Sequence, residues 1–269
     1  MGTNLYYYAI FEGAYSHVYS FFLFSAWIYA LKEFEKTQEK KYWLNLFALA
    51  TLVILVRQIN AVFLLLSFLM LKNEIALARN KSAKDWLYGF GISALIFLPQ
   101  IGYNIYLTGT PFFYSYQNEG FIYWHSPKIK EVILGFENGW LSTNPILILS
   151  LIGLAFLWKT HKKETISIGL ILLSCTYLYA SWWCYNLGCA YGHRGFVDIY
   201  PFLILPFAFF IDHILVQKNR VFNWLIYLFL IGTIAYNLKY IYTYDSCWPI
   251  SFEQSDFEIF WHFLTSNTK

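Results

Sequence analysis

The feature that most constrains the fold is an alternation of long apolar runs with short connectors rich in Lys and Arg. About 20 apolar residues in a helix cross the hydrocarbon core of a bilayer, so such runs predict membrane-spanning helices. We expect about eight of them, with ends uncertain by a few residues. The segments are Tyr15–Leu31, Tyr42–Val56, Asn60–Leu71, Trp86–Asn104, Leu141–Trp158, Thr165–Trp182, Ile199–Val216 and Val221–Ile241.

Composition indicates the same class. Charged residues make up 13% of the chain and the mean hydropathy is +0.44, whereas about a quarter of the residues of a soluble domain are charged. We therefore expect an all-α polytopic membrane bundle that forms a single membrane domain over residues 1–269. Nucleic-acid binding is not expected, because the basic residues lie in separate short connectors.

The positions of the basic residues predict the topology. Most of the 19 Lys and Arg residues fall in four connectors, which all lie on one side if both termini lie on the other. The positive-inside rule makes that side cytoplasmic. The loop 105–140, the Gly188–Asp198 segment and the tail 242–269 are then extracytoplasmic. The four connectors are Lys32–Lys41, Lys72–Asp85, Lys159–Glu164 and Gln217–Arg220.

The apolar stretch Tyr42–Leu71 is too long for one crossing. As a single helix it would run roughly 45 Å against a core of about 30 Å. It would also place Arg57 near the middle, at a cost of about 2.5–3.5 kcal/mol. We therefore predict a pair of short helices joined by an outward turn at Arg57–Asn60, in a recess below the outer surface.

The Gly188–Asp198 segment is the first of the predicted binding elements. Its glycines allow a ligand to approach the backbone, and an Arg beside a His suits a phosphate. We predict that His193 and Arg194 bind a phosphate, supported by the loop residues Gly188, Tyr191, Gly192 and Asp198. The alternative is a local pair of Arg194 with Asp198, four residues on.

Arg57 is the third predicted phosphate ligand. Its guanidinium could bind the same anion, or it could instead cap the carbonyls that end its own helix. Near the mouth of the first span, Glu12 and His17 could help to remove a proton from an acceptor hydroxyl. The alternative is that Glu12 and His17 are polar residues of the membrane interface.

An aromatic outer loop and a neighbouring Trp form a possible sugar site. Tyr and Trp rings stack on sugars, while Asn and Glu side chains bond hydroxyls. The residues are Tyr116, Asn118, Glu119, Trp124 and Trp183. The alternative for the loop is a short amphipathic helix lying on the membrane.

No metal or other cofactor is expected, because the sequence has no zinc-ligand spacing, phosphate-binding P-loop or dinucleotide fingerprint.

Cys184, Cys189 and Cys247 lie on the predicted outer side, where disulfides can form. Their spacing does not select a pairing.

Several motifs together resemble bacterial membrane glycosyltransferases of the GT-C superfamily, the group that contains protein mannosyltransferases and aminoarabinose transferases. The likeness extends from about Gly2 to Phe207 and is closest to the uncharacterised GT-C-like proteins of Bacteroidetes-type bacteria. It is carried by Gly2–Leu5, Tyr15–Phe24, Arg57–Asn60, Pro99–Phe113 and Ser181–Pro201.

The resemblance implies an inverting, hexosyltransferase-type enzyme of the bacterial inner membrane. Such an enzyme moves a sugar from a polyprenyl-phosphate-linked donor to a lipid or glycan acceptor at the outer face, among membrane lipids. The family carries a catalytic Asp in an outward loop that follows a first helix, and no such helix and loop precede Gly2. We therefore expect the C-terminal portion of such a fold, or an inactive relative, and the catalytic residue stays unassigned.

Two other function classes use the same residue types. A flippase or transporter for a lipid-linked sugar would bind the same phosphate, but its spans should carry more polar residues than these do. An O-antigen ligase or polymerase of another fold also uses outward Arg and His, although the Tyr191–Arg194 context fits that group less well.

Overall fold

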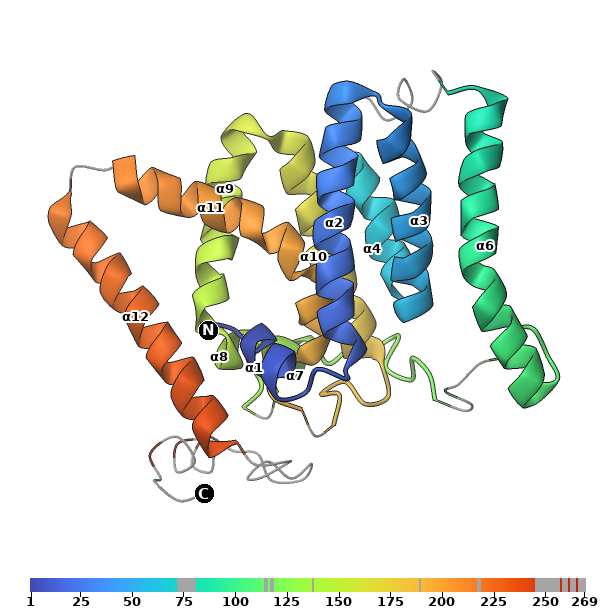
Figure 1. Cartoon of the computed structure of the whole chain (residues 1–269). Coiled ribbons are helices and arrows are strands. Elements are labelled where there is room, and N and C mark those ends of the chain that lie inside the picture. The colour runs from blue at the N-terminus through green and yellow to red at the C-terminus, as the bar shows by residue number, and fades with distance from the viewer. Residues whose placement is uncertain are drawn as a thin grey trace.

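The fold consists of helices and the loops that join them (Figure 1). The computed structural model describes residues 1–71, 81–113, 116, 119–136, 138–188, 190–216, 219–244, 257, 261 and 265. Within these ranges every regular element is an α-helix or a short 3-10 helix. Four of the described helical segments are long and apolar enough to cross a membrane, so this is a membrane protein. They are Ala83–Thr108, Lys162–Ser181, Arg194–Ile214 and Arg220–Thr243.

Each of the predicted apolar segments is helical. The first half of the chain contains α1 (Leu5–Ile10), α2 (Ser16–Thr37), α3 (Lys40–Val56), α4 (Asn60–Ser67), η1 (Phe68–Met70) and α6 (Ala83–Thr108). The second half contains α7 (Ile129–Leu134), α8 (Trp140–Thr143), η2 (Pro145–Leu147), α9 (Ile148–Thr160), α10 (Lys162–Ser181), η3 (Arg194–Ile199), α11 (Tyr200–Val216) and α12 (Arg220–Thr243).

The helices at the other predicted spans are too short, or not apolar enough over a sufficient length, to be counted as membrane crossings. Helices α3, α4 and α9 have 17, 8 and 13 residues, fewer than the roughly 20 that a perpendicular crossing needs. Helix α2 is long enough, but its last turns carry Lys32, Glu33, Glu35 and Lys36. The structure therefore shows helices at all the predicted positions without showing that each one spans.

The chain breaks at Arg57, as predicted. Helix α3 ends at Val56, and Arg57 adopts an extended backbone conformation (φ −153°, ψ 115°). The Arg57 carbonyl accepts a hydrogen bond from the Asn60 N–H at 3.0 Å, which closes the turn into α4. Helix α4 runs back beside α3 (Figure 1). The turn between them lies higher in the bundle than the lower end of α6, because α3 is the shorter helix.

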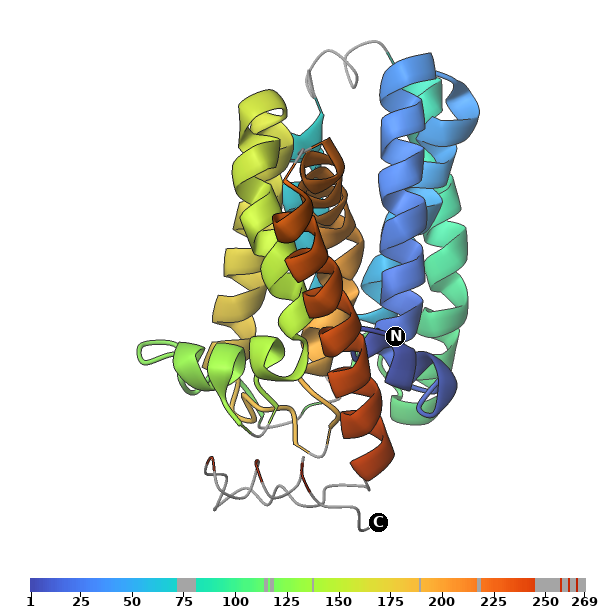
Figure 2. The same cartoon turned by 90° about the vertical axis from the view of Figure 1, so that its left-hand side faces the viewer.

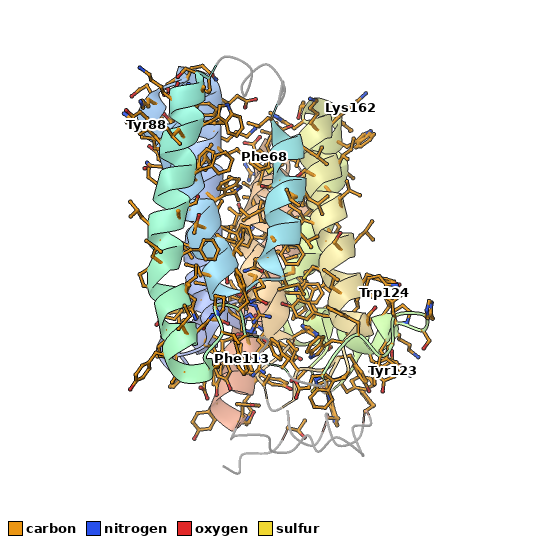
Figure 3. All side chains as sticks on the ribbon, turned by 90° about the vertical axis from the view of Figure 1, so that its right-hand side faces the viewer. Phe68, Tyr88, Phe113, Tyr123, Trp124 and Lys162 are labelled. Atoms are coloured by element: carbon orange, nitrogen blue, oxygen red, sulfur yellow. The ribbon has the colours of Figure 1, made fainter. Side chains whose placement is uncertain are left out.

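The two ends of the bundle differ in character. The basic connectors after α2 and α9 lie at the upper end of Figure 1, and Lys162 marks that end in Figure 3. There Lys32 bridges Glu164 (Nζ to Oε1, 3.1 Å) and donates to the Met70 carbonyl at 2.8 Å. Helices α1, α7 and α8 and the N-terminus gather at the opposite end (Figures 1 and 2). We call the latter the aromatic end, because Tyr123 and Trp124 lie there beside α10 (Figure 3).

Large side chains fill the core between α2, α4, α10 and α11. Phe24 on α2 packs edge-on against Phe202 on α11, with ring centroids 5.2 Å apart. Trp27 on α2 is buried and donates from Nε1 to Ser67 Oγ at 2.8 Å, which satisfies both polar groups in an apolar surrounding. These contacts fix α2 against α4 and α11, the elements that flank the candidate site.

Helix α6 lies at the edge of the bundle (Figure 1). It begins at a capping box in which Ser82 Oγ accepts from the Asp85 N–H, and the Asp85 side chain accepts from the Ser82 N–H. Its contact with the bundle is mainly with α3, where Trp86 packs edge-on against Trp43 at 4.8 Å. Many of its other apolar side chains, such as Leu95 and Leu98, are exposed.

Candidate functional site

A polar cluster lies at the aromatic end, where α2, the α3–α4 turn, α10 and η3 meet. We call it the Arg57 cluster; it comprises Ser16, His17, Arg57, Tyr179 and Asp198. The guanidinium of Arg57 is at its centre. It contacts a residue from each of the other three elements, which lie 40 to 141 positions away in sequence.

Arg57 is held by acceptors on each side of its guanidinium. Nη2 donates to the Tyr179 hydroxyl at 3.0 Å, and Nη1 donates to Ser16 Oγ at 3.3 Å. Nε lies 3.1 Å from Asp198 Oδ2 as an ion pair, although the angle is not that of a hydrogen bond. The side chain keeps 17% of its surface exposed, whereas Asp198 is fully buried.

Asp198 supplies the negative charge of the cluster. A buried carboxylate is costly unless it is paired and hydrogen-bonded. Here Oδ1 lies 2.8 Å from His17 Nδ1, and Oδ2 faces Arg57. Asp198 is thus the residue that joins α2 to the α3–α4 turn.

The predicted alternative pairing of Arg194 with Asp198 is wrong. Both residues lie in η3, a 3-10 helix, in which residues three apart align and residues four apart point in different directions. Asp198 pairs with His17 and Arg57 instead. The Arg194 guanidinium lies over the ring of Tyr15, 4.7 Å from its centroid.

Arg194 is nevertheless a neighbour of the cluster. Tyr15, which it covers, directly precedes Ser16 and His17 at the start of α2. The Arg194 side chain is partly exposed, in contrast to the buried residues that follow it in η3. The structure therefore brings two of the three predicted phosphate ligands, Arg57 and Arg194, to the same end of α2.

His193 is fully buried and serves a different purpose. Its Nε2 donates to the Tyr185 carbonyl at 2.9 Å, and its ring packs edge-on against Tyr179 and Phe196. Burial lowers the pKa of His193 to about 3, so the imidazole is neutral at pH 7. A neutral, enclosed ring attracts an anion less than an imidazolium does. In the structure His193 packs against the ring of Tyr179.

The glycines of the loop allow close packing. Gly192 has φ +61°, and a Cβ there would meet Thr143 Oγ1 at 2.6 Å. A Cβ on Gly195 would overlap the ring of Tyr179. Gly188 also has positive φ, and its carbonyl accepts from Asn138 Nδ2 at 2.8 Å. The predicted supporting role of this loop therefore has a clear physical form, which is contact with Thr143 and Tyr179.

Tyr191 anchors the same loop to the N-terminal segment. It is fully buried, its N–H donates to the Tyr8 hydroxyl at 2.9 Å, and its hydroxyl donates to the Asn237 carbonyl at 3.1 Å. Asn4 donates from Nδ2 to the Tyr191 carbonyl at 3.2 Å, and its Oδ1 accepts from the Tyr200 hydroxyl at 2.7 Å.

The hydrogen-bond partners of Tyr191 were missed by the sequence analysis, as was Tyr179. The available signal was weak: asparagines in an aromatic surrounding, such as Asn4 and Asn144, must find hydrogen-bond partners when they are buried. The Asn4 N–H does donate to Asn144 Oδ1, at 2.6 Å. No local spacing identifies that partner, which is 140 positions away.

Part of the predicted sugar site lies beside the cluster. The aromatic loop within residues 105–140 lies along the end of α10. The Tyr123 N–H donates to the Ser181 carbonyl at 3.0 Å, and the Trp183 N–H donates to the Gly120 carbonyl at 2.9 Å. The rings of Tyr116 and Phe121 pack edge-on against Trp182, at 5.4 and 5.0 Å.

Trp124 and Trp183 are partly exposed, at 45% and 42%. Trp124 packs edge-on against Phe121 at 5.8 Å and against Tyr177 at 5.0 Å. Glu119 precedes this group, and its N–H donates to the Tyr116 carbonyl at 2.8 Å. Exposed aromatic surface therefore lies on the loop that covers the end of α10.

Other predicted residues are not joined to the cluster. Glu12 accepts from the Tyr7 hydroxyl at 3.5 Å, on the turn before α2. Asn118, Cys189 and Cys247 lie outside the described residues, as does most of the tail 242–269. Cys184 is a free thiol in the structure.

The chemistry that this arrangement permits follows from its charges. Among the described residues of the cluster, Arg57 and Asp198 balance each other, and the nearby Arg194 adds a second positive charge at the partly exposed edge. The described part of the chain contains no grouping of three or more His, Cys, Asp or Glu side chains placed to hold a metal ion. The Arg194 edge of the cluster can thus attract an anion.

Comparison with known proteins gives no further guide, since no protein-family model matches the chain and no curated protein or solved structure is detectably similar to it.

Proposed function

We propose that this chain is part of a GT-C-type membrane glycosyltransferase and that it binds the phosphate of a polyprenyl-phosphate-linked sugar donor at the aromatic end. The observation that carries the proposal is the convergence of Arg57 and Arg194 beside the start of α2. Two guanidinium groups lie near one carboxylate there, and guanidinium groups bind phosphate through paired, charge-assisted hydrogen bonds.

The depth of the turn supports a lipid-linked ligand. Arg57 ends α3 after 17 residues, so its guanidinium lies short of the full bilayer thickness. A phosphate on a prenyl chain enters from the membrane side, and such a ligand can reach a recessed cation while its chain stays in the lipid. A soluble anion would instead meet Arg194 first, at the partly exposed edge.

Sidedness is proposed from charge. If all the apolar helical segments cross, the chain has eight spans and the basic connectors share one side. The aromatic end then faces outward from a bacterial inner membrane, where lipid-linked sugars are used. The exposed rings of Trp124 and Trp183 offer stacking surfaces for a sugar, next to the proposed phosphate site.

Binding of undecaprenyl phosphate to the purified protein, measured by native mass spectrometry or microscale thermophoresis, tests the proposal. Replacing Arg194 with Ala should weaken binding by about 10- to 100-fold, because one charge-assisted contact contributes roughly 1.5–3 kcal/mol. Lys162→Ala, at the opposite end, is the matched control and should bind like the wild type. Equal binding by Arg194→Ala and wild type would overturn the proposed site.

A second measurement separates transfer from transport. A transferase releases the sugar from a radiolabelled polyprenyl-phosphate sugar when the acceptor is present, whereas a flippase moves the intact lipid between leaflets of a liposome. Movement of the intact lipid without release would favour the transporter, and release to water or acceptor would favour the enzyme.

A further inference from the structure

His17 is held in one orientation by contacts at both ring nitrogens. Nδ1 lies 2.8 Å from Asp198 Oδ1, and Nε2 lies 2.9 Å from Arg57 Nη1. We propose that His17 is the proton acceptor of the reaction, that Asp198 orients it, and that Arg57 covers the face of its ring until a phosphate draws the guanidinium away. This inference rests on the proposed function.

The contact with Asp198 fixes the tautomer. A carboxylate only accepts hydrogen bonds, so the proton of the neutral ring lies on Nδ1, which donates to Asp198 Oδ1, and the free lone pair is on Nε2. Arg57 Nη1 lies 2.9 Å from Nε2 and 3.3 Å from Nδ1. Because it is close to both ring nitrogens, it lies over the face of the imidazole and not in line with the Nε2 lone pair.

This geometry prepares Nε2 to take a proton. A carboxylate bonded to Nδ1 keeps the imidazole in the required tautomer and stabilises the imidazolium that forms on protonation. Asp198 is fully buried, so its charge acts on His17 with little screening by solvent. The arrangement is that of a general base with its orienting carboxylate, in which the guanidinium of Arg57 lies over the imidazole ring.

Arg57 is the movable member of the three. His17 and Asp198 are 2% and 0% exposed, whereas the Arg57 side chain is 17% exposed. A phosphate would compete for the same donors that now face His17, Ser16 and Tyr179, and Arg194 would help to attract it. A guanidinium N–H that bonds the phosphate no longer contacts His17. Anion binding and exposure of the His17 ring are therefore coupled.

The proposed step balances. The acceptor hydroxyl oxygen forms a bond to the anomeric carbon of the donor sugar, and the bond from that carbon to the phosphate oxygen breaks. The bonding electron pair leaves with the polyprenyl phosphate, whose added charge Arg57 and Arg194 face. The hydroxyl proton passes to Nε2 of His17, which becomes an imidazolium beside Asp198.

Chemical modification of His17 tests the coupling directly. Diethyl pyrocarbonate acylates accessible, unprotonated imidazole nitrogens, and peptide mass spectrometry locates the product. In the wild-type protein without lipid, His17 should be protected. Addition of undecaprenyl phosphate should raise its modification rate about tenfold, and inorganic phosphate at the same concentration should have a smaller effect, because it lacks the chain that places the anion at the recessed turn.

Two variants separate the covering of His17 by Arg57 from the attraction of the lipid phosphate by Arg194. Arg57→Ala should make His17 reactive without any lipid, while Arg194→Ala should leave it protected. Because Arg57→Ala leaves the Asp198 charge unpaired and can impair folding, the double variant Arg57→Ala/Asp198→Asn serves as the second test. His161, whose side chain is 44% exposed at the opposite end, should react equally in every sample, and the buried His193 should react in none.

The outcomes distinguish the two proposals. Protection of His17 in both Arg57 variants, or in wild-type protein that demonstrably binds undecaprenyl phosphate, would overturn the proposed covering and leave the lipid site standing. Failure of the wild type to bind the lipid would overturn the proposed function. The role of His17 in transfer would fall with it, even if the variants show that Arg57 covers His17.

Discussion

Tyr8 and Tyr191 exchange two hydrogen bonds: the Tyr191 N–H donates to the Tyr8 hydroxyl at 2.9 Å, and that hydroxyl donates to the Tyr191 carbonyl at 3.2 Å. One side chain of α1 thus satisfies both backbone groups of a buried loop residue. The loop that carries Arg194 and Asp198 is held by this pair on its N-terminal side.

Tyr8→Phe should destabilise the protein by about 1–3 kcal/mol, because it leaves the buried Tyr191 N–H without its partner and removes one of the two donors to the Tyr191 carbonyl. The midpoint of thermal unfolding in a mild detergent measures the loss. Tyr6→Phe removes a hydroxyl from the same helix without affecting these bonds and is the control. Equal midpoints for the two variants would show that the pair does not stabilise the loop.

Gly195→Ala should be destabilising by about 1–3 kcal/mol, because the new methyl group would overlap the ring of Tyr179. Displacement of that ring should also disturb the hydrogen bond from Arg57 Nη2 to the Tyr179 hydroxyl. Gly232→Ala on α12 is the control, since nothing lies within 4 Å of a Cβ there, and it should be neutral or slightly stabilising. Thermal unfolding midpoints compare the two.

Asp198→Asn should cost about 3 kcal/mol, because Arg57 would keep a largely buried charge without its counter-ion. The double variant Arg57→Met/Asp198→Asn removes both charges and should recover part of the loss. A double-mutant cycle on unfolding midpoints measures the coupling. Additive effects of the two single substitutions would show that the ion pair contributes nothing to stability.

Stability should fall as the pH falls below about 6.5, because burial lowers the pKa of His193 to about 3. Between these values the unfolded chain binds a proton at His193 and the folded chain does not, which favours unfolding by on the order of 1 kcal/mol per pH unit. Above pH 6.5 this contribution is fully present and constant. His193→Gln, which keeps a donor for the Tyr185 carbonyl, should have a smaller loss of midpoint between pH 7 and pH 5 than the wild type.

Cysteine labelling should place the aromatic end outside. In a background in which Cys184, Cys189 and Cys247 are Ser, a cysteine at Glu119 should react with a membrane-impermeant maleimide on intact cells. A cysteine at His161 should react only after permeabilisation. The reverse pattern would place the aromatic end in the cytoplasm and remove the proposed access to an outer-face donor.

The helices could be predicted because their signal is local. Apolar runs and basic connectors are read along the chain, and the break at Arg57 followed from the length of Tyr42–Leu71 and the cost of a charge in lipid. The structure confirms a short helix pair with Arg57 at its turn. Whether each helix spans depends on length and tilt in the membrane, which composition does not specify.

The site could be predicted only in part, since its contacts are long-range. The sequence identified Arg57, His17 and Asp198 separately, but the ion pair between Arg57 and Asp198 joins positions 141 apart. The local alternative, Arg194 with Asp198, assumed α-helical spacing where the chain forms a 3-10 helix. Tyr179 was missed because a tyrosine in an apolar helix has the same local pattern whether or not an arginine bonds to it.

The position of α6 has a consequence for handling the protein. Helix α6 contacts the bundle mainly through α3, so few protein contacts fix its position. The surrounding lipid packs against the rest of its surface. Delipidation with a short-chain detergent should therefore loosen residues 83–108 while α2 and α10 keep their native arrangement. Proteolysis or hydrogen exchange confined to that helix would be the first sign of damage, well before the rest of the bundle unfolds.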